Sequence, residues 1–174
     1  VADIRTKKGL SLSKMIDDVP MLTVTEEDGK RLVREFVFQQ IGRNGSVCDM
    51  DVMSQSTGTL RLLTLIPAIY FAINNGKTVL IDEIDNGIHP MLIKNLVKFF
   101  GESKSNGQLI YTTHETALLN QQELLRPDEV WFVEKVEGCT KMYSLNDFKI
   151  HKTISIENGY LDGRFGAIPF IGTL

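Results

Sequence analysis

The sequence has few of the features that mark a secreted or strongly nucleic-acid-binding protein. Its 174 residues include only two cysteines, Cys48 and Cys139, which stand far apart without CxxC or HxxxH companions. Such sparse thiols predict a reduced, cytosolic protein. We expect no signal peptide at the start of the chain. The net charge of −3 gives no global attraction to nucleic acid or anionic membranes.

Long apolar runs are also scarce. The longest, Leu62–Ile73, is interrupted by Thr64 and Pro67 and is far shorter than the ~20 residues that a membrane helix needs. We therefore expect no membrane segment. The hydrophobic share of 43% is enough for the core of one sizeable domain. Because the first residue is Val1 and not methionine, we also expect the chain to be a fragment of a longer protein.

The pattern of residues predicts an α/β protein with a lead-in at residues 1–29 and one main lobe at residues 30–174. The lead-in is polar, and we expect it to be irregular. The helix–strand–helix–strand order between residues 60 and 113 implies a mostly parallel sheet flanked by helices. The expected elements are an antiparallel hairpin (31–40 and 46–52), a buried helix (60–73), a strand (79–81), a helix (90–100), a strand (109–113), a short helix (115–125) and a late hairpin (129–133 and 141–145).

Two adjacent carboxylates follow the apolar strand Val79–Ile81, and they are the most informative feature of the chain. Charge is disfavoured inside a buried strand, so Asp82 and Glu83 must lie at its carboxyl end, where parallel sheets place their ligand sites. Asp82 there suits a hard cation such as Mg²⁺, bound directly or through water. Glu83 is placed to polarise a water molecule.

Two further segments agree with a site for a phosphorylated ligand. Ser56, Thr57, Gly58 and Thr59 precede the apolar helix, and hydroxyls and glycine at a helix N-terminus favour an anion. Alone, this pattern is more often an ordinary helix cap. His114 follows the next buried strand, where an imidazole donates readily to a phosphate oxygen.

In this order, the three segments resemble the C-terminal half of an ABC-type ATPase. Ser56–Thr59 with Arg61 resembles the signature motif, and Val79–Glu83 resembles Walker B with its catalytic glutamate. Asp85–Gly87 resembles the D-loop, and His114 resembles the switch histidine. The bacterial OLD-like, abortive-infection class of AAA-type ATPases shares the patterns DExDxGxHP and GxFGAxPxI. These patterns stand here at Asp82–Pro90 and Gly163–Ile171. The class is related to the structural-maintenance and double-strand-break-repair ATPases.

One motif of that family is missing, because no G-x-x-x-x-G-K-[ST] phosphate loop occurs in the chain. Gly42–Ser46 begins like one, but it lies between two predicted strands, and we interpret it as a hairpin turn. The resemblance therefore implies the half of a P-loop ATPase that lacks Walker A. We expect such a half to bind nucleotide poorly and to hydrolyse no ATP by itself.

The resemblance also implies how the complete protein works. Two subunits form a head-to-tail dimer with ATP and Mg²⁺ between them. In each site Asp82 orients Mg²⁺, Glu83 activates water and His114 contacts the γ-phosphate. Ser56, Thr57, Gly58 and Thr59 complete the site of the other subunit, and Asp85 makes contact across the dimer interface.

Two other interpretations stay open. Asp82–Asp85 also fits the DExD box of a helicase core, and the missing phosphate loop is compatible with a degenerate interaction domain that hydrolyses nothing. The biological setting is equally open between phage defence and DNA-related processes. A DNA, toxin or nuclease partner fits either setting, and no membrane partner is expected.

Overall fold

The computed structural model describes residues 2–7, 15–16, 19–20, 22–27, 30–120, 124–150 and 155–168, with side chains from residue 37 onward. The chain divides into two compact units. The first consists of Val1–His89 and Lys104–Thr112, and the second of Pro90–Ser103 and Thr113–Leu174. Each unit is described by itself below.

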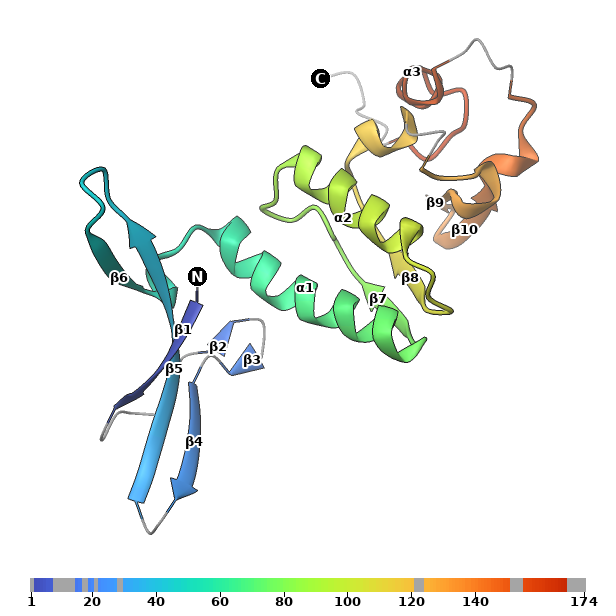
Figure 1. Ribbon diagram of the computed structural model, residues 1–174. Coiled ribbons are helices and arrows are strands. Elements are labelled where there is room, and N and C mark those ends of the chain that lie inside the picture. The colour runs from blue at the N-terminus through green and yellow to red at the C-terminus, as the bar shows by residue number, and fades with distance from the viewer. Residues whose placement is uncertain are drawn as a thin grey trace. The chain divides into compact units, whose positions relative to one another are not determined.

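An antiparallel sheet occupies the beginning of the first unit. The long strand β5 (Lys30–Ile41) lies between β1 (Ala2–Lys7) and β4 (Leu22–Glu27), and it also pairs with β6 (Val47–Asp51), as Figure 1 shows. Two short strands, β2 (Met15–Ile16) and β3 (Val19–Pro20), pair with each other.

The lead-in at residues 1–29 is therefore not irregular where the structure describes it. Leu22–Thr25 alternates apolar residues with threonine, a period of two that suits an antiparallel strand. The polar clusters around this stretch hide that period in the sequence.

The hairpin predicted from residue 31 onward is confirmed. Ile41 pairs with Val47, and the chain reverses between them at Gly42–Ser46. The amide of Gly42 donates to the carbonyl oxygen of Ser46 at 2.8 Å, and Gly45 has a positive φ of 76°. Glycine adopts this conformation without steric cost. The interpretation of Gly42–Ser46 as a turn is thus correct.

Helix α1 (Thr57–Asn75) follows the short 3₁₀-helix η1 (Val52–Ser54). It packs against the strands β7 (Thr78–Ile81) and β8 (Gln108–Tyr111). It buries a single stripe formed by Leu65, Ile69 and Ala72. Its other faces are not covered, since Tyr70 and Phe71 are 62% and 60% exposed. The expectation of a helix buried on nearly every face is therefore wrong for the described chain.

Within the described residues, α1 alone has the length and composition of a membrane-crossing helix. It is longer than its apolar run because Thr57–Arg61 and Asn74–Asn75 add polar turns at its ends. Core helices of soluble proteins pass the same test, so this finding is weak support for a membrane location.

Strands β7 (Thr78–Ile81) and β8 (Gln108–Tyr111) pair in parallel, with Val79 opposite Leu109 and Ile81 opposite Tyr111. The prediction that these two strands are neighbours is confirmed. A parallel pair beside a helix fits an α/β fold. The larger sheet of the described chain is antiparallel, however, so a mostly parallel sheet stays a prediction.

The second unit begins with helix α2 (Pro90–Glu102), which starts at a proline as predicted and buries Ile93 and Val97. Within the helix predicted at residues 115–125, the structure has the 3₁₀-helix η2 (Thr116–Asn120). Residues 121–123 of that prediction lie outside the described residues. The late hairpin is confirmed, with β9 (Trp131–Val136) antiparallel to β10 (Cys139–Ser144).

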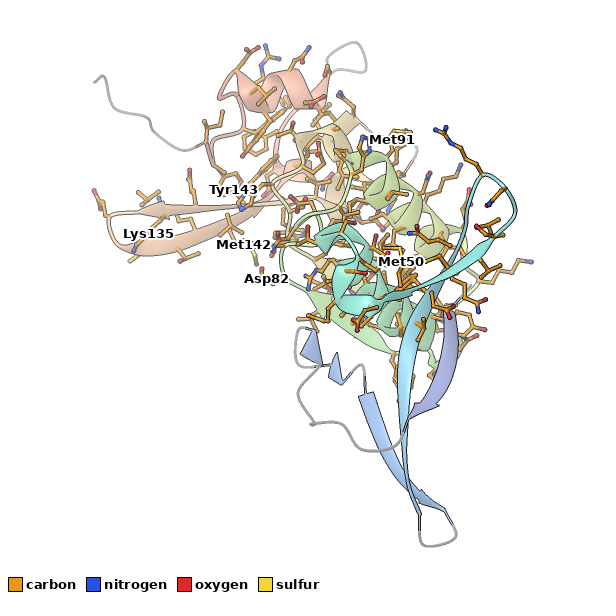
Figure 2. The ribbon with its side chains drawn as sticks, turned by 90° about the vertical axis from the view of Figure 1, so that its left-hand side faces the viewer. Met50, Asp82, Met91, Lys135, Met142 and Tyr143 are labelled. Carbon is orange, nitrogen blue, oxygen red and sulfur yellow. The ribbon has the colours of Figure 1, made fainter. Side chains whose placement is uncertain are left out.

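The core of the second unit is aromatic. Short 3₁₀-helices flank the hairpin, η3 (Pro127–Glu129) before β9 and η4 (Leu145–Asp147) after β10, and helix α3 (Ile156–Leu161) follows them. The buried members of the core are Phe132, Leu145, Ile156 and Phe165. Tyr143 packs against this core, whereas Lys135 is exposed near the hairpin turn (Figure 2). Of the predicted GxFGAxPxI pattern, Pro169, Phe170 and Ile171 lie outside the described residues.

Candidate functional site

The two predicted carboxylates lie where the parallel strands end. Asp82 directly follows β7, and Thr112 directly follows β8 (Figure 2 labels Asp82). The amide of Thr112 donates to the carbonyl oxygen of Ile81, and the amide of Ile84 donates to that of Thr112, both at 3.0 Å. The sheet ladder thus extends past both strands and fixes the backbone of the acidic tip.

The hydroxyl of Thr112 bonds to both predicted site residues. It donates to Asp82 Oδ1 at 2.5 Å and accepts the backbone amide of Glu83 at 2.8 Å. A hydroxyl has one donor and two acceptor positions, so it makes both bonds at once. This arrangement leaves the second oxygen of the exposed Asp82 carboxylate available for a ligand.

The backbone at Glu83 is held in an uncommon conformation. Its φ is +47°, in the left-handed region that non-glycine residues seldom adopt. Ile84, next in the chain, is 0% exposed, and the amide of Asn86 donates to the carbonyl oxygen of Glu83 at 3.1 Å. These contacts hold Glu83, whose side chain is exposed, in its strained conformation.

Arg61 connects the predicted signature helix α1 to the acidic tip. Its Nη2 donates to the carbonyl oxygen of Asp82 at 2.9 Å and to that of Glu83 at 3.4 Å. The guanidinium therefore binds the peptide backbone of the two residues. It also adds a fixed positive charge beside the acidic tip, which favours an anionic ligand.

The predicted signature residues form the start of α1. Ser56 is its N-cap, and its hydroxyl accepts the backbone amide of Thr59 at 3.2 Å and lies 2.9 Å from the hydroxyl of Thr59. Ser56 and Thr57 are exposed. The sequence motif is therefore a true cap, and the exposed first turn still presents the positive end of the helix dipole.

Gly58 packs directly on the turn that resembles the D-loop. A Cβ atom at Gly58 would lie 2.4 Å from the carbonyl oxygen of Gly87, so only glycine fits there. Gly87 itself has a φ of +73°. Asp85 lies in the same turn, where its carbonyl oxygen accepts the amide of Ile88 at 3.0 Å. The structure thus brings two predicted motifs, 29 residues apart, into contact within the first unit.

The carboxylate oxygens at this site are suited to Mg²⁺ that binds together with a nucleotide. Among the residues that the structure describes, no group of three or more His, Cys, Asp or Glu side chains is placed to hold a metal ion. Mg²⁺ in nucleotide sites usually takes one or two carboxylates and completes its shell with water and phosphate oxygens. An exposed carboxylate oriented by a hydroxyl, as at Asp82, matches that requirement.

His114 belongs to the second unit, two residues beyond Thr112. Its side chain is exposed, and it stands between Thr113 and Glu115, which are joined by a bond from the amide of Glu115 to Thr113 Oγ1 at 3.0 Å. Its place beside the phosphates stays a prediction.

The sequence pattern does not reveal the most important contact of the site, which is that of Thr112. In the sequence this residue stands out only as a neighbour of His114 or as part of a helicase-like pattern. The available signal is a hydroxyl one residue past a strand predicted to run beside β7. Since parallel strands end at the same edge, that hydroxyl has to lie near Asp82.

One short segment of the described chain has letters in common with a phosphate loop. Gly76–Lys77–Thr78 spells part of one, but Gly76 is the C-cap of α1 and Thr78 begins β7. A phosphate loop needs the opposite order, from strand to helix, so that the helix N-terminus faces the phosphates.

The comparison with known families identifies the type of domain. The family described as "AAA domain, putative AbiEii toxin, Type IV TA system" matches residues 5–120, about two thirds of the chain. No curated protein matches the sequence.

Proposed function

Since the chain belongs to this family of AAA domains, which are generally ATPases of the P-loop type, we propose that it is the signature-bearing, C-terminal half of an ABC-type, OLD-like ATPase. The observation that carries the proposal is the hydroxyl of Thr112, which bonds to Asp82 and Glu83 at the carboxyl ends of two parallel strands. Phosphoryl transfer depends mainly on positioning and on neutralisation of charge. The oriented carboxylate of Asp82 and the anchored backbone of Glu83 contribute to positioning at this edge.

Each residue of the acidic tip has a distinct role in the proposal. Asp82 holds Mg²⁺, which neutralises charge on the phosphates when it is bound with ATP. Glu83 accepts a hydrogen bond from the attacking water and aligns it with the γ-phosphate. The side-chain amide of Asn86 lies 3.5 Å from Glu83 Oε2 and limits the directions that this carboxylate adopts. His114 donates to a γ-phosphate oxygen.

The signature residues act on the ATP of a second subunit. The first turn of α1, at Ser56–Thr59, exposes Ser56 and Thr57 and offers a helix N-terminus to the γ-phosphate of the partner. Asp85 contacts the partner nearby. Arg61 and Gly58 join this turn to the acidic tip of their own subunit. Closure on one nucleotide is thereby coupled to the geometry of the other site.

The phosphate loop has to come from outside these 174 residues. We expect the chain alone to hydrolyse no ATP and to bind Mg²⁺-ATP weakly, because affinity in P-loop proteins rests on the loop amides and lysine. Calorimetry on the chain measures this directly. A tight, Mg²⁺-dependent isotherm would contradict the proposal that the phosphate cradle is elsewhere.

The head-to-tail arrangement is tested by mixing two inactive variants of the loop-containing protein. Ser56→Arg places bulk and charge where the partner's γ-phosphate is expected, and Glu83→Gln removes the carboxylate that aligns water. In a mixed dimer, one site keeps Glu83 from the first variant and Ser56 from the second. Mixing should therefore restore up to about a quarter of the wild-type turnover, because random pairing makes half of the dimers mixed and each has one intact site.

Two controls make that result decisive. Each variant alone must stay inactive after subunit exchange, and a protein with both changes must fail to complement either one. If the mixture stays inactive while ATP still promotes dimerisation, Ser56 does not act in trans and the ABC-type arrangement is wrong. A helicase core would show no ATP-dependent dimer, and a degenerate domain would show no turnover in the wild type.

The setting of the reaction is also a proposal. The scarcity of cysteine supports a cytosolic location, and AAA-domain proteins are typically soluble. The description of the family refers to a toxin of a toxin–antitoxin system. That wording supports a toxin-related partner over a purely DNA-directed role.

A further inference from the structure

The segment that follows His114 is fastened to helix α3 by a network of side-chain hydrogen bonds within the second unit. The hydroxyl of Thr116 donates to Glu157 Oε1 at 2.8 Å, and the amide of Asn120 donates to Glu157 Oε2. Thr116 and Asn120 are the first and last residues of η2. One carboxylate therefore holds both ends of this short helix.

Asn120 returns the contact by capping α3. Its Oδ1 accepts the hydroxyl of Ser155 at 2.8 Å and the backbone amide of Glu157 at 3.4 Å. Ser155 is the N-cap of α3, and its hydroxyl in turn accepts the amide of Asn158 at 3.2 Å. Asn120 and Glu157 thus join the two helices by hydrogen bonds in both directions, in addition to the local caps of each helix.

Further hydrogen bonds connect Thr113, Glu115 and Ala117 at the beginning of η2. The amide of Glu115 donates to Thr113 Oγ1, and Glu115 Oε1 accepts the amide of Ala117 at 3.0 Å. His114 stands inside the first of these turns. Short 3₁₀-helices have poor hydrogen-bond geometry and little stability of their own. The conformation around His114 consequently depends on what holds η2.

We propose that Glu157 is a positioning residue that fixes the segment Thr113–Asn120 and, through it, the place of His114. The catalytic part of this inference rests on the proposed function, in which His114 contacts the γ-phosphate. Glu157 itself touches no substrate in this account. Its importance comes from binding both ends of η2 with a single charged group, since hydrogen bonds to charged groups are the stronger kind.

An exchange of partners provides a sharp test. Glu157→Gln removes the charge and one of the two acceptor oxygens, so the side chains of Thr116 and Asn120 can no longer both donate to residue 157. Asn120→Asp places a carboxylate opposite Glu157, so two acceptors meet. The double variant Asn120→Asp/Glu157→Gln restores one donor and one acceptor and keeps the contacts with Thr116 and Ser155. Glu102→Gln, at an exposed ion pair with Lys98 on α2, is the control for the change of charge alone.

Amide hydrogen exchange on the 174-residue chain measures how firmly the segment Thr113–Asn120 is held. Each single variant should speed exchange at Ala117 and Leu118 by roughly tenfold or more, and the double variant should return it to the wild-type rate. Glu102→Gln should leave it unchanged. Wild-type exchange in both single variants would overturn the proposal.

Turnover of the loop-containing protein reads the consequence for His114. Each single variant should lower kcat by about tenfold with little change in the KM for ATP, and the double variant should recover it. In a His114→Ala background the same changes should have no further effect. Additive losses would show that Glu157 does not act through His114, and would overturn the inference. A wild-type protein without any turnover would refute the proposed function instead, whereas the exchange pattern would still decide whether Glu157 holds the segment.

Discussion

Different interactions stabilise the acidic tip of the first unit (Asp82, Glu83 and Thr112) and the aromatic core of the second unit, each within its own unit. At the tip, Asp82, Glu83 and Thr112 are all exposed, and polar contacts fix their positions. In the core, Phe132 is 6% and Phe165 4% exposed, and their rings stack with centroids 5.8 Å apart. The acceptors of this site are open to solvent, so burial of these three side chains does not position them. Changes at the tip should therefore alter rate more than stability, and changes in the core should do the reverse.

The largest effect on stability is expected in the aromatic core. Phe165→Ala removes a ring that contacts both Phe132 and Phe148, so it should lower the free energy of unfolding by about 3–5 kcal/mol. Denaturant unfolding followed by Trp131 fluorescence measures this loss. Leu161→Ala is the control, because Leu161 is 58% exposed and its removal should cost far less. Equal losses in the two variants would mean that the core is not closed around Phe165.

A smaller loss of stability is expected where two predicted motifs touch in the first unit. Gly58→Ala forces its Cβ against the carbonyl oxygen of Gly87, which has to move, at an expected cost of about 1–3 kcal/mol. Gly101→Ala is the matched control, since Gly101 lies in α2 with open space around it. That change should be neutral or stabilising, because alanine is the better helix former. If Gly58→Ala is equally harmless, the contact between α1 and the turn at Gly87 is absent in solution.

At Thr112, in the acidic tip, we expect a large loss of turnover and only a small loss of stability. Thr112→Val keeps the shape but removes the hydroxyl that orients Asp82 and Glu83, so turnover of the loop-containing protein should fall by about tenfold or more. The free energy of unfolding should change by no more than about 1 kcal/mol. Thr112→Ser keeps the hydroxyl and should retain most of the turnover. The distinction between tip and core would be wrong if the decrease in the free energy of unfolding exceeded the increase in the activation free energy of hydrolysis.

The smallest effect concerns the phenol of Tyr143, which links the aromatic core to the turn near Gly166. It donates to the carbonyl oxygen of Phe165 at 2.9 Å, and Tyr143→Phe should cost about 1 kcal/mol at neutral pH. Burial raises the pKa of Tyr143, and the carboxylate of Glu134 raises it further.

The raised pKa gives this contribution a defined pH dependence. Because the folded pKa lies above the unfolded value of about 10, the neutral phenol stabilises the fold fully below that pH. The contribution is lost as the pH rises through the folded pKa. Unfolding at pH 8 to 11 should therefore show the wild type and Tyr143→Phe converging at alkaline pH. A constant difference between them would contradict the raised pKa.

The sequence predicts those parts of the molecule that local patterns determine. The apolar run before Asp82, the proline at the start of α2 and the turn at Gly42–Ser46 all have short-range causes, and each prediction is confirmed. The parallel pairing of Val79 with Leu109 follows from the order of helices and strands. Local pattern thus suffices for these elements and for the edge at which the carboxylates lie, but not for the strands of residues 1–29.

Contacts between distant residues are beyond the reach of those patterns. Nothing near Arg61 in the sequence indicates that its guanidinium binds the backbone at Asp82, and nothing near Asn120 points to Glu157. The exposed faces of α1 escape prediction for a similar reason. Composition shows that Tyr70 and Phe71 are apolar, but only the packing shows which side of the helix is covered.

The most direct test of the central claim is the rate of ATP hydrolysis by the loop-containing protein with Glu83→Gln. The substitution preserves size and leaves Asp82 and Thr112 in place, so Mg²⁺-ATP should bind with unchanged affinity and the closed dimer should accumulate. We expect kcat to fall by about 10²-fold or more, as for loss of a general base. Turnover equal to that of the wild type would show that Glu83 has only a structural role and would contradict the account.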